Sequence, residues 1–253
     1  MAVNRDLKKN YFLGGGELFI NRGNGFEYFG ATDKMSINYK VDKFEHKNSE
    51  GEMLTLDMEV VKEVSAEVSF DTVTLSPEVL ALAFGGDYTQ TTQNAASSVE
   101  NDFSGVIGGV VYELTASKVK NVVVSYNDGS EDVNAVENID YSVDYEFGRI
   151  EIAKGGALDA KDIKVTFDNE ATSITQITSL NNVSREVALR FRSHGQVGNN
   201  KETTIHKVNL MINGSYDLKS IDKNASLNFS GKVLKDTTKP EGKQFVETVI
   251  VGA

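Results

Sequence analysis

Residues 56–70 constrain the fold of this chain more than any other stretch, because apolar and polar side chains alternate there over fifteen positions. A period of two predicts a β-strand with one buried and one solvent-exposed face. At about 3.3 Å per residue the strand would span about 50 Å, whereas strands usually have about five or six residues. We therefore expect it to project from its domain or to bend at a bulge near Val61 and Lys62. The positions of the expected buried face are Leu56, Met58, Val60, Lys62, Val64, Ala66, Val68 and Phe70.

The other face of this strand is acidic, and its carboxylates would repel one another when aligned. The pattern indicates either an ordinary solvated sheet face or a wall that must not bind a polyanion. A matching alternation over residues 35–41 predicts a preceding strand, and the polar residues 44–54 predict the loop between the two strands. The acidic residues of this face are Asp57, Glu59, Glu63 and Glu67.

A short helix is expected directly after the long strand. Ser76 is a favoured N-cap residue, Pro77 suits the first helical position, and Glu78 suits the positive end of the helix dipole. The residues that follow are almost all apolar, so the helix should be buried. The glycines at 85–86 should end it.

The period-two alternation continues through most of the chain, which predicts a mostly β protein. Two polar stretches divide it, and we expect linkers at 91–102 and 169–179. Between them, residues 103–168 are predicted to form an inserted small β-sandwich, because several short strands follow one another with turn signals between them. Residues 1–90 and 180–253 then form the core domain, a β-sandwich or barrel with one short flanking helix. Within it, residues 208–218 should form a hairpin and residues 245–251 a buried closing strand.

Composition excludes several classes of function. The chain has 253 residues and no cysteine, which excludes disulfides, thiol catalysis and cysteine-ligated zinc. Its net charge of −11 argues against general binding to nucleic acids or anionic membranes. We expect no membrane span and no secretory signal, because no apolar run is long enough.

Motifs that carry chemistry are weak in this sequence. No histidine stands in a HExxH pattern, and no serine stands in a GxSxG turn. Residues 127–132 resemble a calcium loop in composition but lack its spacing, so a hairpin turn is the better interpretation. We therefore predict no catalytic, cofactor-binding or metal site, and no enzyme. The histidines are His46, His194 and His206.

In the order of its segments, the chain resembles the tail tube (major tail) proteins of long-tailed bacteriophages. The matching stretches are GGGELFINRGNGFEYFGATDKMSINY, EHKNSEGEMLTLDMEVVKEVSAEVSFD, LSPEVLALAFGG, VALRFRSHGQVGNNKETTIHKVNLMINGSYDLK and ASLNFSGKVLKD. They cover most of residues 10–90 and 180–253. The segment with NIDYSVDYEFGRIEI and DIKVTF resembles a small immunoglobulin-like module of virion proteins.

This resemblance implies a β-sandwich whose copies close into rings, usually hexameric, that stack into the conduit for DNA ejection. It also implies partners: further copies of the chain, the tape-measure, baseplate or tip and tail-terminator proteins, and genomic DNA in transit. The expected location is the virion, after synthesis in the host cytoplasm, with no cofactor and no membrane binding. In this family the acidic residues Asp57, Glu59, Glu63 and Glu67 would face the lumen. The loop that would contact the next ring is Glu45, His46, Lys47, Asn48, Ser49, Glu50, Gly51 and Glu52.

Three other functions remain open at this point. A tube of a contractile secretion apparatus would share the fold. A carbohydrate-binding or adhesin module would favour an aromatic platform, yet the chain has no tryptophan and its tyrosines and phenylalanines fall mostly on apolar faces. An enzyme such as a glycosidase would need a site signature that the sequence does not carry.

Overall fold

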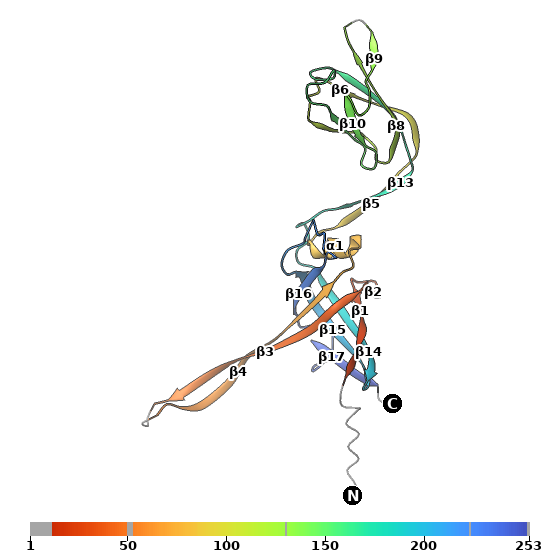
Figure 1. Ribbon diagram of the computed structural model, residues 1–253. Helices are drawn as coiled ribbons and strands as arrows, with labels where there is room; N and C mark the ends of the chain where they lie inside the picture. Colours follow the sequence, from red (N-terminus) through yellow and green to blue (C-terminus); the bar gives the residue numbers. More distant parts are fainter. Residues whose placement is uncertain (1–11, 50–52, 130, 223, 252–253) are drawn as a thin grey trace. The chain divides into compact units, whose positions relative to one another are not determined.

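The computed structural model describes residues 12–49, 53–129, 131–222 and 224–251. These residues form seventeen strands and one helix, so the prediction of a mostly β fold with one short helix is confirmed. The chain divides into two compact units (Figure 1). Unit 1 comprises Met1–Tyr88 and Ile177–Ala253, and unit 2 comprises Thr89–Gln176.

Unit 1 is built on one antiparallel sheet whose strand order is β2-β1-β14-β15-β16-β4-β3, with β17 paired to β15. The long strand β4 lies where the alternation predicts it. The strands are β1 (Leu13–Asn21), β2 (Phe26–Gly30), β3 (Thr32–Asn48), β4 (Thr55–Thr72), β14 (Glu186–Val197), β15 (Asn200–Ile212), β16 (Leu227–Val233) and β17 (Val246–Val251).

The sheet of unit 1 curls until its two ends meet across the core. Phe29, on the end strand β2, packs edge-on against Phe70 of β4 and Phe229 of β16, with ring centroids 5.2 and 5.7 Å away. Phe70 and Phe229 stack at 5.3 Å. Such aromatic pairs stabilise a fold by about 0.5–1.5 kcal/mol beyond the burial of their area.

The single helix, α1 (Pro77–Ala83), packs onto this core through Val79 and Leu82. The Ser76 hydroxyl accepts the backbone N–H of Val79 at 3.4 Å, which confirms the predicted N-cap. Gly85 follows with a φ of +57°, a left-handed conformation that favours glycine at a helix end.

Unit 2 packs two small sheets around a core of its own, which includes Val124, Ile150, Val165 and Phe167. One sheet has the order β6-β12-β8-β9 and the other the order β10-β11-β7. The strands are β6 (Ala96–Phe103), β7 (Val111–Glu113), β8 (Val119–Asn127), β9 (Asp132–Asn134), β10 (Tyr141–Asp144), β11 (Arg149–Ile152) and β12 (Ile163–Asn169). The strands β5 (Tyr88–Gln93) and β13 (Thr172–Ile177) pair as a separate two-stranded sheet.

The predicted linkers at 91–102 and 169–179 are wrong in detail, because both contain strands. Most of 91–102 is β6, which pairs with β12 from Phe103↔Ile163 to Ala96↔Asn169. β6 is an edge strand whose side chains are mostly exposed, so its composition is polar like that of a linker. The stretch 169–179 contains β13.

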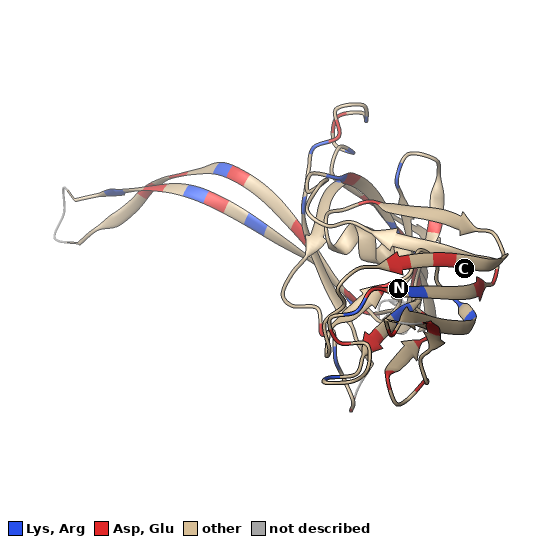
Figure 2. Ribbon diagram, turned by 90° about the horizontal axis from the view of Figure 1, so that it is seen from above, with Lys and Arg blue, Asp and Glu red and all other residues tan. Residues whose placement is uncertain are grey.

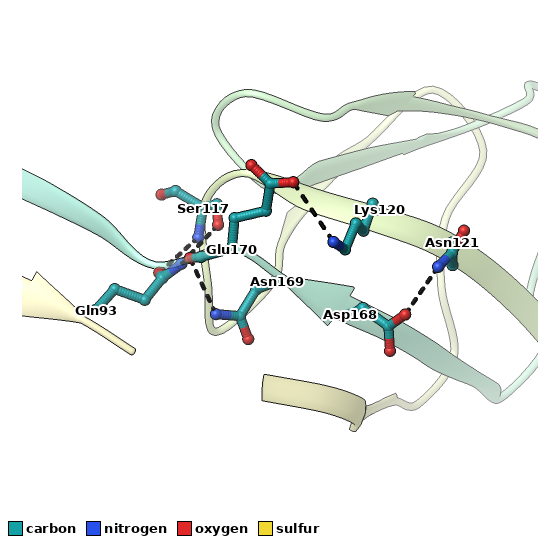
Figure 3. A network of polar contacts seen from close by, with 7 residues as sticks. All are labelled: Gln93, Ser117, Lys120, Asn121, Asp168, Asn169 and Glu170. Atoms are coloured by element: carbon teal, nitrogen blue, oxygen red, sulfur yellow. Dashed lines mark hydrogen bonds and ion pairs between the residues drawn. The ribbon is translucent and has the colours of Figure 1, made fainter. Parts of the chain in front are cut away.

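A polar network ties the ends of β5 and β12 into unit 2 (Figure 3). The Gln93 amide donates to the backbone oxygens of Ser117 at 2.7 Å and Glu170 at 2.9 Å, and it accepts the Ser117 N–H at 3.0 Å. Nearby, Asp168 accepts the Asn121 amide and the Ser98 N–H, both at 2.8 Å. Ser98 and Asn121 have positive φ angles of 54° and 52°, so this carboxylate holds two residues in a left-handed conformation.

Two further expectations in unit 1 are wrong. β15 ends at Ile212 and its partner β16 begins only at Leu227, so residues 208–218 form no hairpin. The apolar stretch 245–251 is largely exposed rather than buried. Among the described strands β17 pairs with β15 alone, and of its residues Val246 packs against the core while those from Thr248 to Val251 are exposed.

Candidate assembly interface

The outer parts of β3 and β4 form a two-stranded arm that extends away from the rest of unit 1 (Figure 2). The two strands pair antiparallel from Thr32↔Thr72 to Asn48↔Thr55. β4 also pairs with β16, but only over Glu67–Thr72. From Val64 to the tip, each described side chain of β4 is therefore exposed. We call this projecting part, residues 39–49 and 53–64, the arm.

The arm exposes many large apolar side chains, between 44% and 75% of each being accessible to solvent. The prediction that the apolar face of β4 is buried throughout is wrong, because burial begins only at Ala66. An exposed apolar surface of this extent is typical of an interaction site. The residues are Tyr39, Val41, Phe44, Met53, Leu54, Leu56, Met58, Val60, Val61 and Val64.

Two β-bulges interrupt the arm. Asp42 lies opposite Glu63 while Lys43 lies opposite Val61, so Lys62 is an extra residue on β4. A second shift, between His46 and Lys47, makes Asp57 another extra residue. The arm therefore both projects and bulges at Lys62, and the two options left open by the sequence occur together.

The bulges also divide the predicted acidic face. Directly opposite residues of an antiparallel pair share a face. Glu63 opposite Asp42 and Glu67 opposite Asn38 lie on one face, whereas Glu59 opposite Glu45 lies on the other. The expectation of one uninterrupted acidic face is thus wrong, because an extra residue shifts the alternation by one position.

Basic side chains lie beside two of the four predicted lumen residues. Figure 2 shows Lys or Arg and Asp or Glu interspersed along the arm. The Lys43 ammonium lies 2.7 Å from Glu59, and the His46 ring nitrogen lies 2.6 Å from Asp57. The hydrogen bond and charge of Glu59 raise the pKa of Lys43. The charge of Glu59 is therefore partly compensated by Lys43, and Asp57 is hydrogen-bonded to His46.

Half of the predicted inter-ring loop lies in a strand. Residues 45–48 belong to β3, and Ser49 follows them. Glu50, Gly51 and Glu52 lie outside the described residues. Polar composition predicted a loop here, but both faces of an isolated hairpin are in water, so polar side chains do not interrupt its strands.

Sequence reasoning missed Phe44 as part of the exposed apolar surface. The signal was present, since Tyr39 and Val41 occupy odd positions and Phe44 an even one. This change of phase in β3 coincides with the bulge at Lys62 in β4.

Strand edges provide a second set of exposed groups in unit 1. β2 and β3 are the end strands of the sheet, and β17 pairs along one edge with β15. Val249, Ile250 and Val251 of β17 are at least half exposed. Edge strands present N–H and C=O groups to which another strand can pair.

A polar cleft of about 550 Å³ is also present in unit 1, next to the β1–β2 turn and α1. Its charged groups are partnered, because Arg22 lies 3.8 Å from Glu27 and Arg185 forms an ion pair with Asp87. The pKa of Glu78 is lowered by a hydrogen bond from its own backbone N–H and, less strongly, from Ser76. The charged groups of this cleft therefore serve local ion pairs and, at Glu78, the N-terminus of the helix.

Neither a metal site nor a membrane-spanning helix is found in the described parts of the chain. Within them, no three His, Asp or Glu side chains gather so that they could hold a metal ion. Their one helix is too short and not apolar enough to be a membrane-spanning segment.

Fold and site together define a class: a mostly β protein with a projecting, apolar hairpin arm, open sheet edges and an inserted β unit. The chain belongs to the family described as Protein of unknown function UCP028589, whose model matches residues 11–247. Among curated proteins, none matches the chain.

Proposed function

We propose that this protein is a structural subunit that self-assembles into stacked rings and so forms the tail tube of a long-tailed bacteriophage. The observation that carries the proposal is the arm, whose large apolar side chains lie in water in the single chain. Full burial of one such side chain contributes up to about 1.5–3 kcal/mol. The arm has ten such side chains, so their burial between copies would strongly favour association.

The open sheet edges support assembly into closed rings. β2, β3 and β17 can each pair with a strand of a neighbouring copy. The arm and β17 are different surfaces of the same unit, so contacts between copies can run head to tail. Head-to-tail contacts close into rings when the rotation between copies permits it.

Charge supports a conduit for DNA. The chain has a net charge of −11, and Asp42, Glu63 and Glu67 outnumber the two lysines, Lys40 and Lys62, that lie on the same face of the hairpin. Phosphate contacts with cations dominate protein affinity for DNA, so a carboxylate-lined wall would let DNA pass without binding it. We propose that Glu63 and Glu67 face this passage.

In this account the role is structural rather than catalytic, and no cofactor takes part. The partners are further copies of the chain together with the tape-measure, baseplate or tip and tail-terminator proteins of the same virion. The protein is made in the host cytoplasm and functions in the phage tail.

The proposal is tested by shortening the arm. Residues 43–62 are replaced by Asn-Gly, a two-residue turn that joins Asp42 to Glu63, which already lie opposite each other. The variant should fold, because the core of unit 1 begins at Ala66 on β4, but it should sediment as a monomer where the natural chain forms large assemblies. Sedimentation velocity measures the assembly, and circular dichroism checks the fold.

A matched control keeps the apolar side chains of the arm. Lys43→Gln with Glu59→Gln removes only an exposed ion pair, and such pairs contribute little. This variant should assemble like the natural chain. Normal assembly of the shortened variant would contradict the proposed role of the arm.

A further inference from the structure

The apolar side chains of the arm occur on both faces of the ribbon. Those on the face of the even-numbered β3 residues begin only beyond the bulge, whereas Val61 and Leu56 continue the odd-numbered face there. Nearer the core, Tyr39 and Val41 share a face with Val64, which lies opposite Val41. We call these three residues the inner patch. Nearer the tip, Val60 lies opposite Phe44 and Met58 lies opposite His46. Phe44, Met58 and Val60 form the outer patch.

The register places the two patches on opposite faces. β3 contains no bulge between Tyr39 and His46, so its odd-numbered side chains lie on one face and its even-numbered side chains on the other. The inner patch is on the odd-numbered face, which continues the core face of Met35 and Ile37. The outer patch is on the even-numbered face.

Side-chain contacts agree with this assignment. The Lys62 ammonium lies over the Phe44 ring, 5.8 Å from its centroid, so the bulge residue is on the face of the outer patch. Near the core the same face is polar, where the hydroxyls of Ser36 and Ser69 are 2.9 Å apart. On the opposite face, Lys43, Glu59 and Val61 occupy the level of the outer patch.

We infer that each arm lies between two further copies of this chain, one covering the inner patch and the other covering the outer patch. This inference rests on the proposed self-assembly. One copy lying against one face would leave the other patch in water.

The charges of the arm favour a second copy over other partners. Four lysines and five carboxylates are interspersed along the arm. The arm is therefore complementary to a surface of mixed charge rather than to a polyanion or a polycation. Unit 1 also offers a matching apolar surface, on the exposed strand β17. The charged residues are Lys40, Lys43, Lys47, Lys62, Asp42, Glu45, Asp57, Glu59 and Glu63.

The absence of cysteine from the chain permits a direct test. A Val41→Cys/Val60→Cys variant carries one benzophenone label on each patch. A small amount of it is assembled with a large excess of the natural chain, irradiated and separated on a denaturing gel. We expect products of three chains from the double variant and of two chains at most from each single variant.

A matched control places both labels on the inner patch. The Tyr39→Cys/Val64→Cys variant should give products of two chains, because both labels then face the same copy. If this control gives as much three-chain product as the Val41→Cys/Val60→Cys variant, the inference is overturned. Labels on one face would then react with two copies, so the two faces would not each contact a different copy.

The outcomes separate this inference from the proposed function. If assemblies form but the Val41→Cys/Val60→Cys variant gives two-chain products at most, the two-copy arrangement is wrong and self-assembly stands. If the natural chain stays monomeric at high concentration and no variant crosslinks, the proposed function is wrong, and the inference fails with it.

Discussion

Asp168 shows how a single side chain organises unit 2. Its carboxylate accepts hydrogen bonds from the Asn121 side chain and from the Ser98 backbone, at residues that both have positive φ angles. The Asn121 bond is the main cause of a lowered Asp168 pKa, and the Ser98 bond adds to it. A carboxyl group whose pKa is lowered by folding stabilises the folded state only while it is ionised.

We therefore predict a pH-dependent effect of Asp168→Asn. The stabilisation is fully present above the unfolded-state pKa of about 3.9 and is lost as the pH falls through the lower folded-state pKa. The variant should melt at a lower temperature than the natural chain at pH 7, and the difference should shrink as the pH falls below about 4. Thermal melts over this pH range measure it, and a constant difference would contradict the assigned role.

At the scale of elements, local patterns predicted more than long-range ones. The N-cap at Ser76, the long strand β4 and its bulge near Lys62 follow from side chains close together in the sequence. The buried part of β4 could not be predicted in this way. Its burial depends on β16, which is distant in the sequence and pairs only with Glu67–Thr72. Alternation predicts that an apolar face will be covered, but it does not predict whether the same chain or another copy covers it.

β17 illustrates the same limit. Its apolar run predicted a buried strand, yet in the single chain it lies at an edge and Val249, Ile250 and Val251 are exposed. The strand β6 was not predicted because its sequence is polar. An edge strand has mostly exposed side chains and needs few apolar residues. For the candidate site, the sequence located the segment and its carboxylates, but not the division into two faces, which depends on pairing register.

Hydrogen exchange should distinguish the arm from the rest of unit 1. A two-stranded hairpin without a covering layer is marginally stable in water, so arm amides should exchange rapidly in dilute monomer while those of β14 and β15 are protected. On assembly, arm amides should become protected by at least about tenfold. Mass spectrometry at low and high protein concentration measures this. Equal protection of the arm in both states would show that it needs no partner.

At the scale of the whole molecule, the account requires that the negative charge of the proposed passage prevents DNA from binding. Glu63→Lys with Glu67→Lys reverses two charges on one face of the hairpin. Assembled particles of this variant should retain DNA fragments at least about tenfold better at low salt, with the gain lost as salt rises. Co-sedimentation of labelled DNA measures retention.

The matched control for this charge reversal is Glu131→Lys with Glu151→Lys, which makes the same change of charge on unit 2. It should increase DNA retention much less, because these residues are not on the hairpin face that we propose to line the passage. An equal increase in both variants would mean that net charge, rather than the position of Glu63 and Glu67, controls DNA binding.

We propose that this chain builds a tube from copies of itself. Negative-stain electron microscopy of the purified protein at increasing concentration would reveal such tubes. We expect rings and stacked, hollow tubes of uniform diameter, held together by the arms. A field of monodisperse single chains at the highest concentration would show that the chain does not assemble by itself.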